Sequence, residues 1–134
     1  MNLSKFLLAG VAGGLVGNIV DFVAHGVVFR STYASMPSLF RQDEGNMVWL
    51  IVGDFVAAFV FLWVYDRVYA SFGGGPKGGA TFGLYAGILA SFPTWIFMHL
   101  LIAGFPYSLS WIWTIVGIAW AVIVGAAVGA VYKK

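Results

Sequence analysis

The 134-residue chain is 61% hydrophobic and only 9% charged, and its mean hydropathy is +0.93. A soluble domain carries about 25% charged residues, so this composition excludes a water-soluble globular protein and indicates a membrane protein. The absence of cysteine excludes disulfides, thiolate nucleophiles and cysteine metal ligands. The net charge of +2 comes from a few scattered basic residues, which report membrane topology rather than nucleic-acid binding.

The first apolar stretch, residues 6–29, is long enough to cross a bilayer. It is also longer than the apolar core of a signal peptide, which has about 7 to 15 residues, so we interpret it as a retained span. Small and polar residues recur in it at spacings of three and four, which places them on one face of a helix. These residues are Gly10, Gly14, Gly17, Asn18, Asp21 and His25. We expect this face to pack against the rest of the bundle.

Three further apolar stretches cover residues 47–65, 79–103 and 109–131. Together the four stretches predict an all-α membrane protein, a four-transmembrane-helix bundle in a single domain over residues 1–134. The second stretch contains Asp54, and the third contains Pro93 and His99.

The distribution of Lys and Arg predicts that both termini are cytoplasmic, because five basic residues fall on the side of the termini and two on the other. The two are Arg30 and Arg41, near Asp43 and Glu44. The glycine-rich residues 71–79 lack the spacing of a phosphate-binding loop and are interpreted as a flexible connector. Aromatic residues near both ends of the spans are interpreted as interfacial belts, with Tyr107, Trp111 and Trp113 at one end and Tyr65, Tyr69 and Tyr132 at the other.

The fourth span carries a stripe of small residues four positions apart, Gly117, Ala121, Gly125 and Gly129. Such a stripe allows two helix backbones to approach closely. It could serve packing within the chain or pairing between chains, and the sequence does not separate the two.

An intramembrane polar cluster of five side chains is expected in the half of the bilayer away from the termini, where a rise of about 1.5 Å per residue brings its two Asp and two His residues to similar depths. The five side chains are Asn18, Asp21, His25, Asp54 and His99. Three interpretations stay open. The cluster could be a structural network that includes an Asp21–His25 pair. It could be the site of a small proton-coupled transporter or channel. Alternatively, the two histidines could hold haem, a pigment or a metal.

Two stretches, HGVVFRSTYASM and GLYAGILASFPTWIFMHLLIAGFPYSLSWI, together with the ending GAAVGAVYKK, resemble a bacterial family of four-span membrane proteins of unknown function. The resemblance rests on Gly26, Phe29 and Tyr33 after a glycine-rich span, and the chain departs from it at Asp21 and His25. It implies a four-span architecture in a bacterial inner membrane and assigns no active site.

The sequence therefore predicts a small integral membrane protein that acts as a packing or accessory subunit, as a homo-oligomer or within a larger membrane complex. Proton-coupled transport through the Asp and His cluster is the first alternative, and cofactor binding by the histidines is the second. An enzyme is not expected, because no nucleophile–base motif is present. The expected surroundings are the lipid bilayer, and nucleic acid is not an expected partner.

Overall fold

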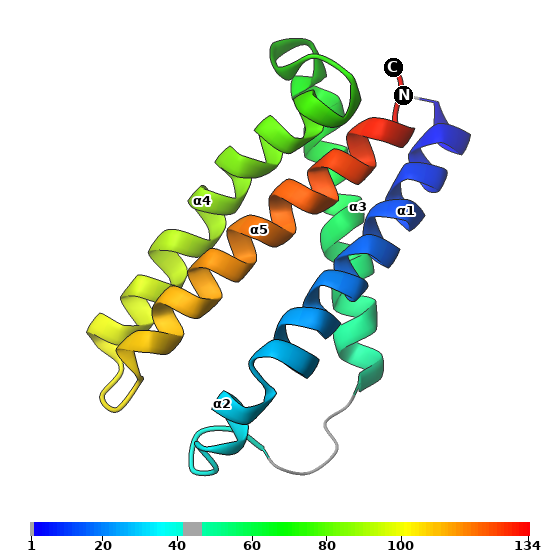
Figure 1. Cartoon of the computed structure of the whole chain (residues 1–134). Coiled ribbons are helices and arrows are strands. Elements are labelled where there is room, and N and C mark those ends of the chain that lie inside the picture. Colours follow the sequence, from blue (N-terminus) through cyan, green and yellow to red (C-terminus); the bar gives the residue numbers. More distant parts are fainter. Residues whose placement is uncertain (1, 42–46) are drawn as a thin grey trace.

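The computed structural model describes residues 2–41 and 47–134. In chain order the described helices are α1 (Leu3–Asp21), η1 (Phe22–Val28), α2 (Arg30–Ala34), α3 (Met47–Phe72), α4 (Gly75–Leu101) and α5 (Tyr107–Val131). Both chain termini lie at the same end of the molecule as the turn between α3 and α4, which we call the terminal end (Figure 1). Helix α2 and the turn between α4 and α5 lie at the opposite end, which we call the loop end (Figure 1).

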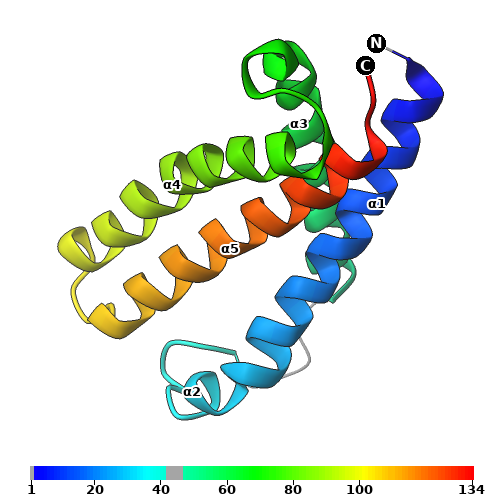
Figure 2. The same ribbon diagram turned by 45° about the horizontal axis from the view of Figure 1, so that its top comes forward.

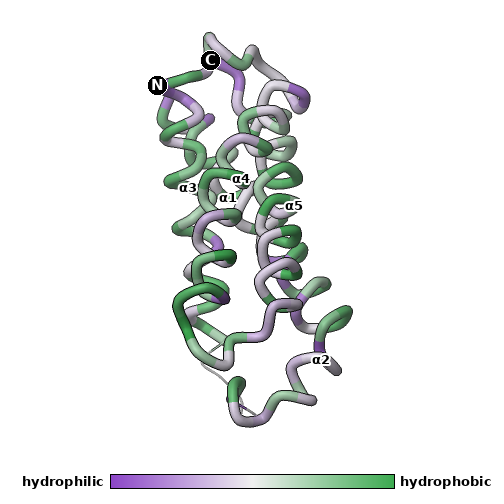
Figure 3. Tube along the Cα trace, turned by 90° about the vertical axis from the view of Figure 1, so that its left-hand side faces the viewer, coloured by the Kyte–Doolittle hydropathy of each residue, from purple (hydrophilic) through white to green (hydrophobic). Residues whose placement is uncertain are grey.

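Four helical segments are long and apolar enough to cross a membrane, Leu3–Val28, Met47–Phe72, Gly75–Leu101 and Tyr107–Val131. Hydrophobic residues run along all of them (Figure 3). Large side chains such as Leu89 and Leu101 are 78% and 80% exposed, as suits contact with lipid rather than water. The predicted all-α, four-span fold is confirmed, and the chain has the architecture of a multi-pass membrane protein.

The boundary between the second and third spans differs from the sequence prediction. Helix α3 continues to Phe72 and α4 already begins at Gly75, so two residues connect them and the predicted flexible connector over residues 71–79 is wrong. Gly73 and Gly75 adopt φ angles of +72° and +80°, a left-handed conformation that favours glycine and makes this tight turn possible. The sequence prediction ended the second span at residue 65, because Asp66 interrupts the apolar pattern. The helix itself continues through Asp66 to Phe72.

Helices α4 and α5 lie side by side as a close hairpin (Figures 1 and 2). Their glycines lie backbone against backbone. A Cβ atom placed on Gly83 would lie only 2.7 Å from the carbonyl carbon of Ala121. A Cβ on Gly125 would lie 2.9 Å from the carbonyl carbon of Gly79. The small-residue stripe of the fourth span therefore packs within the chain, against the glycines of α4.

Helix α1 lies against α3 and α5, and there the glycines accommodate rings instead of backbone. Gly10 faces the ring of Phe59, and Gly17 faces the indole of Trp120. Gly14 in turn faces Phe55. Each missing side chain leaves room for an aromatic ring of a neighbouring helix, which explains why glycines and large aromatic residues are both frequent in this chain.

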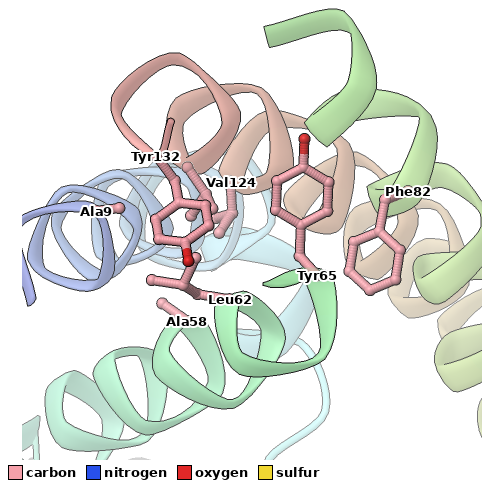
Figure 4. Close-up of a cluster of buried hydrophobic side chains, with 8 residues drawn as sticks. Ala9, Ala58, Leu62, Tyr65, Phe82, Val124 and Tyr132 are labelled. Atoms are coloured by element: carbon pink, nitrogen blue, oxygen red, sulfur yellow. The ribbon is translucent and has the colours of Figure 1, made fainter. Parts of the chain in front are cut away.

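The hydrophobic core is drawn in Figure 4. It lies in the half of the bundle near the terminal end, because its residues are close in the chain to the two termini and to the turn between α3 and α4. Its buried members come from all four spans and from the residue after α5, and they are Ala9, Ala58, Leu62, Tyr65, Phe82, Val124, Val128 and Tyr132. Tyr65 and Tyr132 are 0% and 1% exposed, so the prediction that they form an interfacial belt is wrong. Their hydroxyl groups donate hydrogen bonds to the carbonyl of Gly73 and to the carboxylate of Asp66. This core closes the bundle at the terminal end.

Candidate functional site

Toward the loop end the α4–α5 hairpin spreads away from α1, with α2 near the opening (Figures 1 and 2). A cavity of about 710 Å³ lies between these elements. Its polar lining residues are Asp21, His25, Tyr33, Arg41, Asp54 and Ser91. Its aromatic lining residues are Tyr33, Phe40, Trp95, Trp113 and Trp120. A largely apolar cavity of this size with a few convergent polar groups is typical of a small-molecule binding site.

Two carboxyl groups from different spans meet at this cavity. Asp21 is the last residue of α1 and Asp54 lies on the second turn of α3, and a side-chain hydrogen bond joins them. Both side chains are partly buried. An ionised carboxylate can only accept hydrogen bonds, so a bond between two carboxyl groups requires a proton on one of them. The approach of these two groups therefore favours a proton shared between two membrane-spanning helices.

A π-helical turn positions His25 beside this pair. In η1 each backbone hydrogen bond joins residues that are five positions apart. The N–H of Phe29, for example, donates to the carbonyl of Ala24 at 2.9 Å. Such turns are rare and occur frequently at functional sites. The Nδ1 atom of His25 lies 2.5 Å from the hydroxyl oxygen of Tyr33. The indole of Trp113 donates a hydrogen bond of 3.1 Å to the same oxygen.

The direction of the bond between His25 and Tyr33 depends on the tautomer of His25. The Tyr33 oxygen accepts from Trp113 and keeps its own O–H, which donates to His25 Nδ1 when that nitrogen carries no proton. Burial raises the pKa of Tyr33, an effect that its hydrogen bond from Trp113 partly offsets, so the hydroxyl retains this proton over the physiological range. His25 then carries its N–H on Nε2 when the imidazole is neutral.

Asn18 has a different role from the carboxyl pair. Its side-chain amide donates to the carbonyls of Gly14, at 2.9 Å, and of Ile51, at 3.3 Å. The second bond crosses from α1 to α3, so Asn18 holds these helices together one turn away from Asp21. The predicted Asp21–His25 pair is not formed, because each of these side chains has another partner, Asp54 for Asp21 and Tyr33 for His25.

His99, predicted as a member of the cluster, lies elsewhere. Its Nδ1 atom is 3.0 Å from the carbonyl oxygen of Phe105, and its ring is 4.9 Å from that of Tyr107. It thus fixes the turn between α4 and α5 and does not line the cavity. Within residues 2–41 and 47–134, no three His, Asp or Glu side chains gather in a way that could hold a metal ion. Asp43 and Glu44 lie outside the described residues.

The sequence prediction missed most of the cavity wall. Trp113 was interpreted as a belt residue and Trp120 was given no role, yet both line the cavity from α5. Their spacing of seven residues, with Gly117 between them, would have placed them on one helix face, the same face as the glycine stripe. Tyr33 carried no such signal, because it reaches the cavity from the short helix α2.

A second polar group lies at the terminal end and has a structural role. The carboxylate of Asp66 accepts a hydrogen bond from Tyr132 and forms an ion pair with Lys134, whose nitrogen is 3.4 Å away. Burial and the bond to Asp66 raise the pKa of Tyr132 to about 12. Lys5 also donates to the carbonyl of Lys133 at 3.0 Å. These contacts attach the C-terminal residues to α1 and α3.

The chain was compared with family models, curated proteins and solved structures, and none of them matches it. The resemblance to a bacterial four-span family therefore stays a prediction, and the function has to be argued from the site.

Proposed function

We propose that this protein is a small proton-coupled membrane transporter in which the Asp21–Asp54 pair exchanges its proton for a solute. The observation that carries the proposal is the hydrogen-bonded carboxyl pair at the edge of a cavity of about 710 Å³. Ionisable residues inside membrane spans are costly and commonly mark proton or substrate pathways. A purely structural pair would need no cavity beside it, which is why this geometry favours transport over packing.

The exchange follows from the chemistry of the pair. With a proton between them the two carboxyl groups carry one negative charge, and without it they carry two. Two neighbouring carboxylates repel each other, so loss of the proton is favourable only when a positive group takes its place. A solute that provides such a group therefore binds in competition with the proton. Binding of the solute then releases the proton, and binding of the proton releases the solute. This mutual displacement is the requirement for coupled exchange.

The fold supports movement between two open states. The core closes the bundle at the terminal end, while the cavity lies toward the loop end. The α4–α5 hairpin is held by close glycine contacts and so can move as one body against α1 and α3. Rocking of one helical unit against another around a central site is a common way to alternate access in transporters.

The proposed location is the inner membrane of a bacterium, with both termini in the cytoplasm. The basic side chains at the terminal end support this orientation. The cavity then opens away from the cytoplasm. The packing or accessory role, alone or in a homo-oligomer, stays a prediction, and the stripe that suggested pairing between chains is occupied by α4.

The test uses the full chain in proteoliposomes that hold an imposed pH gradient and an internal pH indicator. A panel of cations, anions and neutral solutes is added one at a time. We expect at least one class to discharge the gradient with the wild-type protein and not with Asp21→Asn or Asp54→Asn. Both variants keep a hydrogen-bonding side chain of the same size. Equal discharge by wild type and variants, or no discharge by any class, would overturn the proposal.

A further inference from the structure

A second cavity reaches the same carboxyl pair from another side. Its volume is about 890 Å³, and the described residues that line it come from α1, η1 and α3. It shares four lining residues with the first cavity, Asp21, His25, Leu50 and Asp54. The two cavities therefore meet at the polar residues, and a ligand can approach the carboxyl groups through either.

The second cavity faces the bilayer. Leu15, Ile19 and Phe22 line it and are 54%, 63% and 62% exposed, on helices that cross the membrane. A polar solute would have to leave water to pass this surface, whereas an apolar molecule already dissolved in the bilayer would not. This entrance thus selects for ligands that partition into lipid.

The first cavity determines the charge of the ligand. Indole rings are the best partners for cations in cation–π contacts, and Trp95, Trp113 and Trp120 line this cavity together with the two carboxyl groups. The lining residues from α4 and α5 are aromatic, apolar or, in Ser91, a hydroxyl, so they add no charge. The side chains of His25 and Tyr33 form a hydrogen bond with each other.

Arg41 is the positive group that also lines the first cavity. It is exposed, in the segment after α2, whereas both carboxyl groups are partly buried. Solvent screens an exposed charge far more than a buried one, so the carboxyl groups dominate the field deep in the cavity.

We propose that the ligand is a lipophilic organic cation that enters from the bilayer between η1 and α3. Its charge lies at Asp21 and Asp54, and its apolar body lies against Trp95, Trp113 and Trp120. Binding displaces the proton of the carboxyl pair to solvent, so one positive charge enters as another leaves. This exchange step rests on the proposed transport function, whereas the ligand class rests on the two cavities.

Equilibrium dialysis of the purified full-length protein in detergent tests the ligand class with three probes. Tetraphenylphosphonium is a lipophilic cation, tetraphenylborate is an anion of the same size and shape, and tetramethylammonium is a compact polar cation. We expect saturable binding of tetraphenylphosphonium alone. Asp54→Asn should weaken it about tenfold or more, and Asp21→Asn provides the same test if the first variant does not fold. Arg41→Gln removes the positive group that lines the first cavity, so it should bind this cation at least as tightly as wild type.

Ile19→Trp tests the route of entry, because it adds bulk to an exposed position at the mouth of the second cavity. We expect slower association of tetraphenylphosphonium with an unchanged dissociation constant. An unchanged association rate would overturn entry from the bilayer.

Two outcomes would overturn the ligand class. One is that tetraphenylborate binds as tightly as tetraphenylphosphonium, and the other is that Asp54→Asn leaves the binding of tetraphenylphosphonium unchanged. If a polar cation or an anion discharges the pH gradient through Asp54, the transport function stands and the ligand class is wrong. If tetraphenylphosphonium binds through Asp54 but no solute discharges the gradient, the ligand class stands and the transport function is wrong.

Discussion

Gly83→Ala is expected to separate α4 from α5, because the added methyl group would meet backbone atoms that cannot rotate away. Its Cβ would lie 2.7 Å from the carbonyl carbon of Ala121 and 3.0 Å from the Cα of Val122. Ordinary contacts begin near 3.4 Å, and the carbonyl oxygen of Ala121 would lie closer still than its carbon, so the helices would have to part by about 1 Å. Overpacking of this kind costs roughly 1 to 3 kcal/mol of folding free energy.

The matched control is Gly53→Ala, also inside a membrane-spanning helix, where an added Cβ would meet no atom within 4 Å. Both variants gain the same helix propensity, about 1 kcal/mol in aqueous peptides, so the difference between them isolates the clash. We expect Gly83→Ala to be less stable than Gly53→Ala by about 1 to 3 kcal/mol.

The measurement is unfolding in mixed detergent micelles, followed by circular dichroism as the fraction of denaturing detergent increases. The same transition midpoint in both variants would refute the reasoning. It would mean that the glycines of α4 and α5 do not form the close contact described.

Three further changes test individual side-chain contacts. Asp54→Leu should destabilise the fold by about 1 to 3 kcal/mol because it leaves Asp21 without its partner, and Asp21→Leu in addition should restore most of this loss; a double variant no more stable than Asp54→Leu would contradict the pairing. Tyr33→Phe should remove the acceptor of the Trp113 indole and cost about 1 kcal/mol, seen as a lower unfolding midpoint; an unchanged midpoint would argue against that bond. The raised pKa of Tyr132, about 12 against 10.0, means that the unfolded chain loses this proton first, so stability should fall as the pH rises from about 10 toward 12. In Tyr132→Phe this decrease should be smaller, and an identical pH profile would show that the hydroxyl contributes nothing.

Hydropathy alone predicted the four spans, because the bilayer demands long apolar helices and tolerates few alternatives. It predicted the end of α3 wrongly at Asp66. That carboxylate accepts a hydrogen bond from Tyr132 and forms an ion pair with Lys134, residues 66 and 68 positions later in the chain. Since such partners are known only once the chain is folded, a window of sequence treats Asp66 as the end of the span.

The candidate site was predicted in part. The helical rise per residue predicted similar depths in the membrane for Asp21 and Asp54. In the structure a side-chain hydrogen bond joins the two residues. The predicted pair of Asp21 and His25 assumed a regular α-helix, in which residues four apart share a face. The π-helical turn changes the register between them, so His25 faces Tyr33 instead. The residues of this turn, FVAHGVV, show no pattern that distinguishes a π-helix from an α-helix.

The glycine pattern shows a different limit. Spacings of four correctly marked faces for close packing, but they do not specify the partner, because a glycine accepts a backbone or a ring equally well. The stripe on α5 meets the glycines of α4, whereas Gly10 and Gly14 on α1 receive the rings of Phe59 and Phe55. Which of these occurs depends on residues in other helices.

The most direct test of the central claim is the infrared spectrum of the purified protein in the region of the carboxylic acid C=O stretch, at neutral pH and without ligand. The claim is that Asp21 and Asp54 hold one proton between them. It predicts a protonated carboxyl band in the wild type that is lost in both Asp21→Asn and Asp54→Asn. Absence of the band from the wild type, or its persistence in both variants, would contradict the account.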